Sequence, residues 1–166
     1  MLIQIRRANP NEAESLTAIA HAAKRHWGYP ESWIERWTSD LAITPDFIAN
    51  NEVFVAVNGG KIVGCCALVL SDSVAELEHM WINPPDMANG IGRALFTQVK
   101  ERARHLRIPA LELSADPNAE GFYERMGAKR IGEVRADMDS QRRVLPRMRI
   151  ELGVAPSGGH SSNTAA

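Results

Sequence analysis

The sequence predicts an α/β fold in which one mixed sheet carries helices on both of its faces. Two observations predict it: apolar runs of strand length recur along the chain, and amphipathic helical patterns lie before and between them. The chain has 166 residues, of which 45% are hydrophobic, and this composition is sufficient for one well-packed core. We therefore expect residues 1–152 to form a single domain.

The first third of the chain predicts one strand followed by helices. Residues 2–7 have the pattern of a short strand, and Asn9 then offers an N-cap for a helix. This helix ends near Gly28, and its buried face is predicted from apolar residues at helical spacing, namely Leu16, Ile19, Ala20 and Ala23. A second helix is expected over residues 31–42, and a short third helix over residues 45–50.

The middle of the chain predicts three strands. Residues 53–57 and 61–70 are apolar runs joined by Asn58-Gly59-Gly60, which is typical of a tight antiparallel hairpin. Residues 74–82 form the next predicted strand. Asn83-Pro84-Pro85 ends it, because proline cannot donate a hydrogen bond to a sheet ladder.

The last part of the chain predicts two more helices among three strands. A long amphipathic helix over residues 90–105 places Leu95, Val99 and Ala103 on its inner face. The remaining elements are a strand at 109–114, a helix at 117–126, and closing strands at 129–135 and 144–152. Residues 153–166 have almost no apolar bulk and are expected to form a flexible tail.

Composition argues against several classes of partner. The chain carries 19 Lys plus Arg against 20 Asp plus Glu, so neither a nucleic acid nor a membrane is expected as a partner. No stretch approaches the roughly 20 apolar residues of a membrane span, and the N-terminus has no apolar run after its charges. A cytoplasmic protein is expected.

The cysteines and histidines predict no metal or redox site. Cys65 and Cys66 are adjacent in an apolar run, where consecutive side chains point to opposite faces of a strand, so we expect no disulfide between them. We interpret them as buried apolar residues in a reducing compartment. His21 and His26 cannot share one helix face as metal ligands, and no metal is predicted.

A glycine turn stands at the N-terminus of the predicted helix at 90–105. Gly90-Ile91-Gly92 follows a strand and a proline-containing loop, and a helix start there would offer free N–H groups and a positive dipole end to a phosphate. A P-loop would need Lys and Ser or Thr where this chain has Arg93 and Ala94, and a dinucleotide fold would need a small residue at Leu95. A glycine-rich helix start without any ligand is the open alternative.

Two longer segments resemble a known family. The strand LEHMWINP with the following DMANGIGRALFTQV, and the later SADPNAEGFYERMGA, stand in the order and at the spacing of the two most diagnostic motifs of the GNAT superfamily of N-acetyltransferases. The order of the predicted strands and helices also matches. The resemblance covers residues 2–152, which is the whole chain except the tail.

This resemblance implies that acetyl-CoA is the cosubstrate and that an acetyl group moves to a primary amine, of a small molecule or a protein, by direct attack in a ternary complex. It also implies a mostly antiparallel sheet with a splayed parallel pair in its middle. A homodimer, common in families of this kind, is a further alternative. The implied contacts of coenzyme A are Met80, Trp81, Ile82, Met87, Ala88, Asn89, Gly90, Ile91, Gly92, Arg93, Asn118 and Tyr123. The family has Gln or Arg where Met87 stands, which removes one polar side chain but leaves the backbone donors.

Two carboxylates and one tyrosine are the candidates for proton transfer. A protonated alkylamine, with a pKa of about 10.4, needs a base at neutral pH. Glu76 and Glu78 are the candidates because strand alternation places them on one face, and the resemblance favours Glu76. Tyr123 matches the family tyrosine that protonates the departing thiolate. For Glu76 and Glu78 the alternative is that both are solvated or ion-paired strand carboxylates. For Tyr123 it is a buried structural hydrogen bond, and for Asn118 a plain N-cap.

The acceptor pocket is predicted from the turn between the first two helices. The resemblance implies that His26, Trp27 and Tyr29 contact substrate there, with packing anchors as the alternative. His79 and Trp81 are expected on the strand face opposite the two glutamates unless a bulge intervenes. A non-catalytic acetyl-CoA sensor or interaction module of the same fold is the rival hypothesis.

Overall fold

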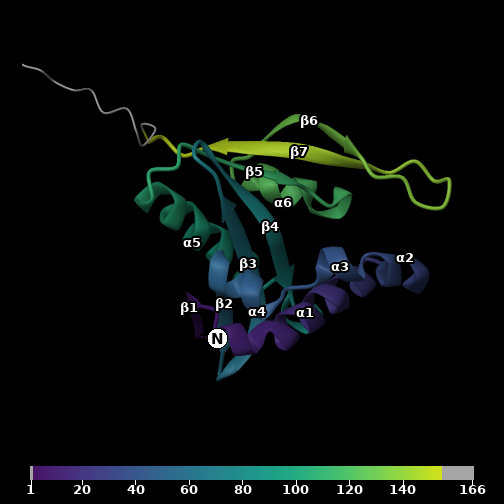
Figure 1. Ribbon diagram of the computed structural model, residues 1–166, viewed down its shortest axis with the longest axis horizontal. Coiled ribbons are helices and arrows are strands. Elements are labelled where there is room, and N and C mark those ends of the chain that lie inside the picture. Colours follow the sequence, from purple (N-terminus) through teal and green to yellow (C-terminus); the bar gives the residue numbers. More distant parts are fainter. Residues whose placement is uncertain (1, 155–166) are drawn as a thin grey trace, which may run out of the picture.

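The computed structural model describes residues 2–154, and all of its named strands belong to one seven-stranded sheet (Figure 1). The order across the sheet is β1-β2-β3-β4-β5-β7-β6, and every neighbouring pair is antiparallel except β4 and β5. The predicted mixed, mostly antiparallel sheet is therefore confirmed. The strands are β1 (Ile3–Arg7), β2 (Glu52–Asn58), β3 (Lys61–Leu70), β4 (Val74–Ile82), β5 (Ala110–Ser114), β6 (Lys129–Arg135) and β7 (Val144–Glu151).

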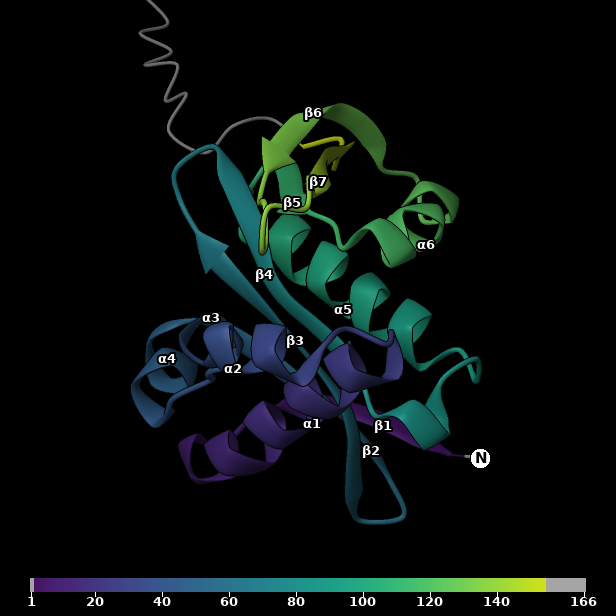
Figure 2. The same cartoon turned by 90° about the vertical axis from the view of Figure 1, so that its right-hand side faces the viewer.

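Helices cover both faces of the sheet, as the sequence predicts (Figure 2). One face packs against α5, whose residues Leu95, Val99 and Ala103 are fully buried. The other face packs against α1, where Leu16 is fully buried, and against α4. The helices are α1 (Ala13–His26), α2 (Glu31–Arg36), α3 (Thr38–Leu41), α4 (Pro45–Asn50), α5 (Ile91–His105) and α6 (Glu120–Arg125), with short 3-10 turns at Pro10–Glu12, Pro84–Asp86 and Pro117–Ala119.

The adjacent cysteines show how β3 divides the two cores. Cys65 packs in the core under α1, and Cys66 packs in the core under α5. Both thiols are free and fully buried, and burial raises the pKa of Cys65 to about 12. Their interpretation as buried apolar residues is confirmed.

The central strands β4 and β5 run parallel and then separate. Residues 74–76 of β4 pair with residues 110–112 of β5, and the pairing stops there. Over residues 77–82, β4 keeps its partner β3 on one side and has no described strand on the other. The predicted splayed pair is thus present, and it leaves an open strand edge in the middle of the sheet.

A β-bulge interrupts β4 at Glu78. Leu77 and His79 pair with consecutive residues of β3, so Glu78 has no partner in the register. Leu77 before the bulge and Met80 after it contact the same core, which means that the alternation changes phase between them. Glu76 and Trp81, the neighbours of Leu77 and Met80, therefore lie on one face, and the expected placement of Trp81 opposite Glu76 is changed by the bulge.

Two further expectations differ from the structure or lie outside it. The helix expected over residues 31–42 is divided at Trp37 into α2 and α3, because Trp37 has a ψ of 7° and the Thr38 hydroxyl donates to the Glu35 carbonyl at 2.6 Å. Residues 155–166 of the expected tail lie outside the described part of the chain. No described helix has the length and apolar character that a membrane crossing requires.

Candidate active site

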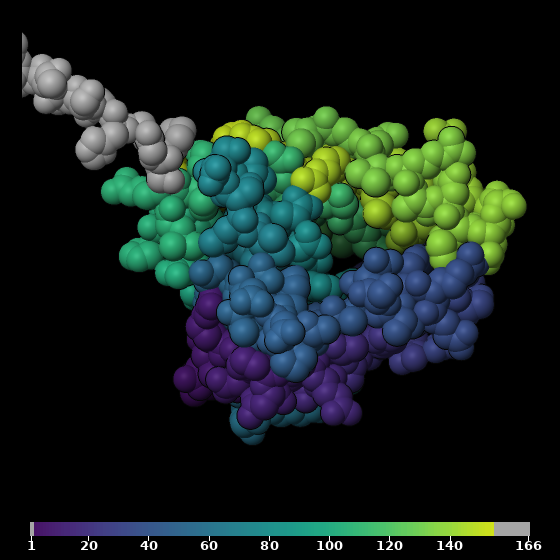
Figure 3. Space-filling model, viewed as in Figure 1, coloured from purple at the N-terminus to yellow at the C-terminus, as the bar shows by residue number. Residues whose placement is uncertain are grey.

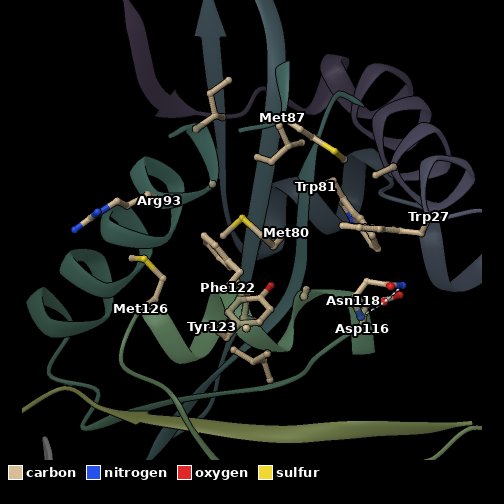
Figure 4. A pocket seen from close by; sticks show the side chains of 18 of the residues that line it. Trp27, Met80, Trp81, Met87, Arg93, Asp116, Asn118, Phe122, Tyr123 and Met126 are labelled. Atoms are coloured by element: carbon tan, nitrogen blue, oxygen red, sulfur yellow. Dashed lines mark hydrogen bonds between the residues drawn. The ribbon is translucent and has the colours of Figure 1, made fainter. Parts of the chain in front are cut away.

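A cavity of about 680 Å³ opens where β4 and β5 diverge (Figure 3). One end is formed by the loop before α5 and by α6, and the other end by α1 and the chain just before β7. Figure 4 shows Met87, Arg93 and Met126 around the first end, and Trp27, Asp116 and Asn118 at the second. The cavity therefore crosses the sheet through the gap between the two parallel strands.

The start of α5 presents backbone donors to this cavity. Gly90 takes a φ of 79°, a left-handed conformation that favours glycine, and it is the residue before the helix. The first N–H bond of α5 runs from Ala94 to the Gly90 carbonyl at 3.0 Å, so the three preceding N–H groups have no backbone acceptor among residues 2–154. Three free donors and the positive end of a 15-residue helix suit an anionic group such as a phosphate.

Gly92, in the first turn of α5, permits close packing against α6. A Cβ atom at this position would lie 3.4 Å from the Cζ atom of Phe122 and 3.9 Å from the Cδ1 atom of Ile82. A larger side chain would collide with the Phe122 ring and push α6 away from α5. The second glycine of the turn therefore leaves room for the Phe122 ring beside α5.

Tyr123 of α6 lines the middle of the cavity with its side chain almost fully buried. Burial raises the pKa of its hydroxyl, which keeps the group protonated at neutral pH. The hydroxyl makes no hydrogen bond to any other described residue, and it points into the open space in Figure 4. A structural hydrogen bond, the alternative reading of this tyrosine, is absent from the described chain.

The two candidate carboxylates lie in different surroundings. Glu78 lines the cavity, and its pKa is raised by partial burial and by the nearby charge of Glu76. Glu76 does not line the cavity, because Arg147 of β7 donates to both of its carboxylate oxygens at 2.5 Å. Glu78, and not Glu76, lines the same cavity as Tyr123.

The second end of the cavity holds three charged residues that sequence reasoning missed: Lys24, Asp116 and Arg143. Lys24 follows Leu16 and Ala20 at intervals of four on the buried face of α1, and this helical position is the signal that could have identified it. Asp116 accepts from Lys24 Nζ at 2.8 Å. No local pattern indicated Arg143, because the β6–β7 hairpin brings it to this place.

The predicted substrate residues meet the cavity to different degrees. Trp27 lines it, whereas His26 and Tyr29 do not. The Tyr29 hydroxyl instead donates to Asp116 at 2.9 Å and accepts from Asn118, so Tyr29 supports the wall from behind. Asn118 is not the N-cap residue, since Asp116 takes that role by accepting the Asn118 N–H at 2.9 Å.

Most of the residues expected to contact coenzyme A do line the cavity. Trp81 combines packing beneath α1 with a place in the wall, and its Nε1 donates to His79 Nδ1 at 2.9 Å. Asn89 is exposed and does not line the cavity. The expected residues that do are Met80, Trp81, Ile82, Met87, Ala88, Gly90, Ile91, Gly92, Arg93, Asn118 and Tyr123. Among residues 2–154, no three His, Cys, Asp or Glu side chains are grouped as metal ligands.

The chain is similar in sequence to the proteins YdhI and YiaC, and in structure to PaiA. The chain is 29% identical over 146 residues to the uncharacterized protein YdhI of Bacillus subtilis, with 82% of each chain covered. It is 26% identical over 102 residues to the peptidyl-lysine N-acetyltransferase YiaC of Escherichia coli, covering 61% of this chain and 66% of that one. The PaiA N-acetyltransferase of Thermoplasma acidophilum, solved in complex with coenzyme A, superposes with a TM-score of 0.70 at 20% identity, over 91% of this chain and 99% of that one.

The family itself is established by the central part of the sequence. Residues 15–128 match the acetyltransferase (GNAT) family, and this segment contains β4, the glycine turn, α5 and the Tyr123 helix. More than half of the chain is matched. The chain therefore belongs to the GNAT family of acetyltransferases and is an acyltransferase.

Proposed function

We propose that this protein transfers an acetyl group from acetyl-CoA directly to a primary amine while both substrates are bound. The observation that carries the proposal is the single cavity onto which free N–H groups of α5, the open edge of β4, Glu78 and the Tyr123 hydroxyl all converge. Each of these features meets a different requirement of the reaction.

The residues around the first end of the cavity fit coenzyme A. The free N–H groups of Ile91, Gly92 and Arg93 would hold the pyrophosphate, and Met87 adds no polar group there. The unpaired edge of β4 over residues 77–82 offers backbone groups to the amide arm, as a neighbouring strand would. When bound, acetyl-CoA supplies an acetyl group activated as a thioester.

Glu78 is the residue that we assign to proton removal. An alkylamine with a pKa of about 10.4 is almost wholly protonated at neutral pH, and a carboxylate at the cavity wall can accept that proton directly or through water. Partial burial and the charge of Glu76 both raise the pKa of Glu78, which moves it toward the value that suits a base at neutral pH. Glu76, held by Arg147, acts on Glu78 through its charge.

Tyr123 is the residue that we assign to proton donation. Its hydroxyl faces the cavity without a protein acceptor and stays protonated because burial raises its pKa. It can therefore give a proton to the sulfur that leaves. Direct attack by the amine is supported by the cysteines, because Cys65 and Cys66 are fully buried away from the cavity and offer no thiolate to carry the acetyl group.

Kinetics with an amine panel test the proposal. The protein is incubated with acetyl-CoA and a panel of amino acids, polyamines and lysine peptides, and acetylated products are identified by mass spectrometry. We expect transfer with intersecting initial-velocity patterns and no acetylated enzyme when acetyl-CoA is present alone. Parallel patterns with an acetyl-enzyme would contradict direct attack. Tight binding of acetyl-CoA without transfer to any amine would favour a sensor.

A further inference from the structure

Lys24, Asp116 and Arg143 form a buried charge cluster at the second end of the cavity, beside Trp27 and Trp81. All three residues line the cavity, and their side chains are each only 11% exposed. Lys24 Nζ lies 2.8 Å from Asp116 Oδ2, and Arg143 Nη2 lies 3.4 Å from the same oxygen. Three segments distant in sequence thus place their charges in one small space.

The charges of the cluster do not balance. Two cations share one carboxylate, and among residues 2–154 no second carboxylate lies within 4.0 Å of either cation. Asp116 also accepts from the Tyr29 hydroxyl and from the backbone and side chain of Asn118, so its oxygens are already occupied. One positive charge is left over in a nearly buried place, where an unmatched charge is costly.

The hydrogen-bond donors of the cluster that have no acceptor in the described chain belong to Arg143. Its Nη2 donates to the Tyr29 hydroxyl at 3.3 Å and to Asp116, but its Nε and Nη1 atoms have no acceptor in the described chain. The guanidinium carbon lies 5.2 Å from the centre of the Tyr29 ring and 4.9 Å from that of Trp37, which fixes the plane of the group. A fixed guanidinium with free donors matches a carboxylate better than a lone ammonium does.

We propose that the amine acceptor also carries a carboxylate, as a free amino acid does, and that Arg143 and Lys24 bind this carboxylate. The inference rests on the proposed amine acetylation and names the class of amine. Glu78 lines the same cavity and would receive the ammonium group of the acceptor. An acceptor that carries both an ammonium and a carboxylate would therefore have an oppositely charged partner for each. Trp27 and Trp81 give apolar wall for its side chain. A lysine side chain of a folded protein has no carboxylate beside its amine and leaves the surplus charge unmatched.

Matched acceptors test the carboxylate directly. Each standard amino acid is compared with its carboxamide and with the amine that lacks the carboxyl carbon, at saturating acetyl-CoA. We expect the best amino acid to exceed its two partners by about 10- to 100-fold in kcat/KM, which is the range for a hydrogen bond to a charged group. An independent reading is the thermal shift that the amino acid, and not its amide, produces in the presence of coenzyme A.

Variants of neighbouring arginines locate the effect. Arg143→Gln is expected to lower kcat/KM with the amino acid by about 10-fold or more, mainly through KM, and so to remove its preference over the amide. Arg142→Gln is the matched control, because Arg142 is the adjacent residue but is exposed and does not line the cavity. Arg143→Lys keeps the charge and is expected to recover part of the preference, which decides the matter if the glutamine variant does not fold.

The outcomes separate this inference from the proposed function. If amines are acetylated but carboxamides, plain amines or lysine peptides react as well as amino acids, the carboxylate inference is wrong and the proposed function stands. The same holds if Arg143→Gln keeps the full preference of the wild type. If no amine is acetylated at all, the proposed function is wrong, and so is the inference that rests on it.

Discussion

Arg147 binds both carboxylate oxygens of Glu76 at 2.5 Å and also donates to Glu112 at 3.2 Å. This pair fixes a carboxylate of the motif strand away from the cavity, only two residues before Glu78. Glu78, which has no partner in the register of β3, lines the cavity. Two glutamates that are close in sequence thus lie in different surroundings, Glu76 in an ion pair with Arg147 and Glu78 in the cavity wall.

Glu76→Gln tests the structural role of this pair. We expect the free energy of unfolding to fall by about 1 kcal/mol, because Arg147 loses a partly buried charged acceptor. The affinity for acetyl-CoA should be unchanged, and the acetyl-transfer step should retain most of its rate at neutral pH. Denaturant unfolding and single-turnover kinetics measure the two effects. A loss of about 100-fold in the chemical step with normal stability would assign the base to Glu76.

Tyr123→Phe separates proton donation from packing, because phenylalanine keeps the ring and removes only the hydroxyl. We expect turnover to fall by about 10-fold or more while the melting temperature and the affinity for acetyl-CoA stay nearly the same. Tyr29→Phe is the contrasting variant, since it removes a hydroxyl that does bond to Asp116 and should lower the melting temperature. A destabilised Tyr123→Phe protein with a normal chemical step would contradict the assignment.

Two substitutions of Gly90 separate the effect of backbone strain from the effect of charge at the proposed phosphate site. Alanine and aspartate at this position both have to adopt a φ of 79°, so both variants should lose about 1 kcal/mol of stability. Nothing lies within 4 Å of a Cβ atom there, so neither variant is excluded by packing. Only Gly90→Asp brings a carboxylate to the anion site, and it should weaken acetyl-CoA binding by about 10-fold or more relative to Gly90→Ala. Calorimetry that gives equal affinities would show that the phosphates bind elsewhere.

Asp116→Asn tests the charge cluster through stability. Burial acts to raise the pKa of Asp116, but the charge of Lys24 and hydrogen bonds from Lys24, Asn118 and Tyr29 outweigh it, and the pKa is lowered. The carboxylate therefore stabilises the fold above its unfolded pKa of about 3.9, and this contribution is lost as the pH falls through the folded value. At neutral pH the variant should lose about 3 kcal/mol, because two nearly buried cations lose their partner.

Unfolding curves at several pH values measure this effect. The difference between wild type and Asp116→Asn should shrink toward low pH, where the wild-type carboxylate is also neutral. Glu101→Gln, which removes one partner of an exposed pair with Arg104, is the control and should change stability little. A difference that is independent of pH would contradict the account of the cluster.

Local patterns were enough to predict the elements on which the cavity is built. The hairpin at Gly59 and Gly60 and the buried face of α5 follow from turn chemistry and helical spacing, and both are present. The phosphate-binding interpretation of Gly90 also used a local signal, the glycine turn before a helix. These features depend on residues close together in the chain.

What could not be predicted depends on partners distant in sequence. Simple alternation fails beyond Glu78 and misplaces Trp81, because a bulge is fixed by the register of β3 against β4 and cannot be recognised from the residues of β4 alone. Arg147 and Arg143 meet Glu76 and Asp116 only after β7 is placed beside β5. The second end of the cavity is therefore a tertiary feature, and the sequence indicated only its aromatic part.

The pH dependence of acetyl transfer by matched glutamate variants tests the central claim, that Glu78 removes the proton from the amine. In the wild type, kcat/KM should fall as the pH drops through the raised pKa of Glu78, because a protonated carboxyl cannot accept a proton. Glu78→Gln should lose this acidic limb, lower turnover by about 100-fold at neutral pH, and recover in part at high pH as more free amine is present. Glu76→Gln should keep the limb but shift it to lower pH, because the charge that raises the pKa of Glu78 is removed. An unaltered acidic limb and near-normal turnover in Glu78→Gln would contradict the account.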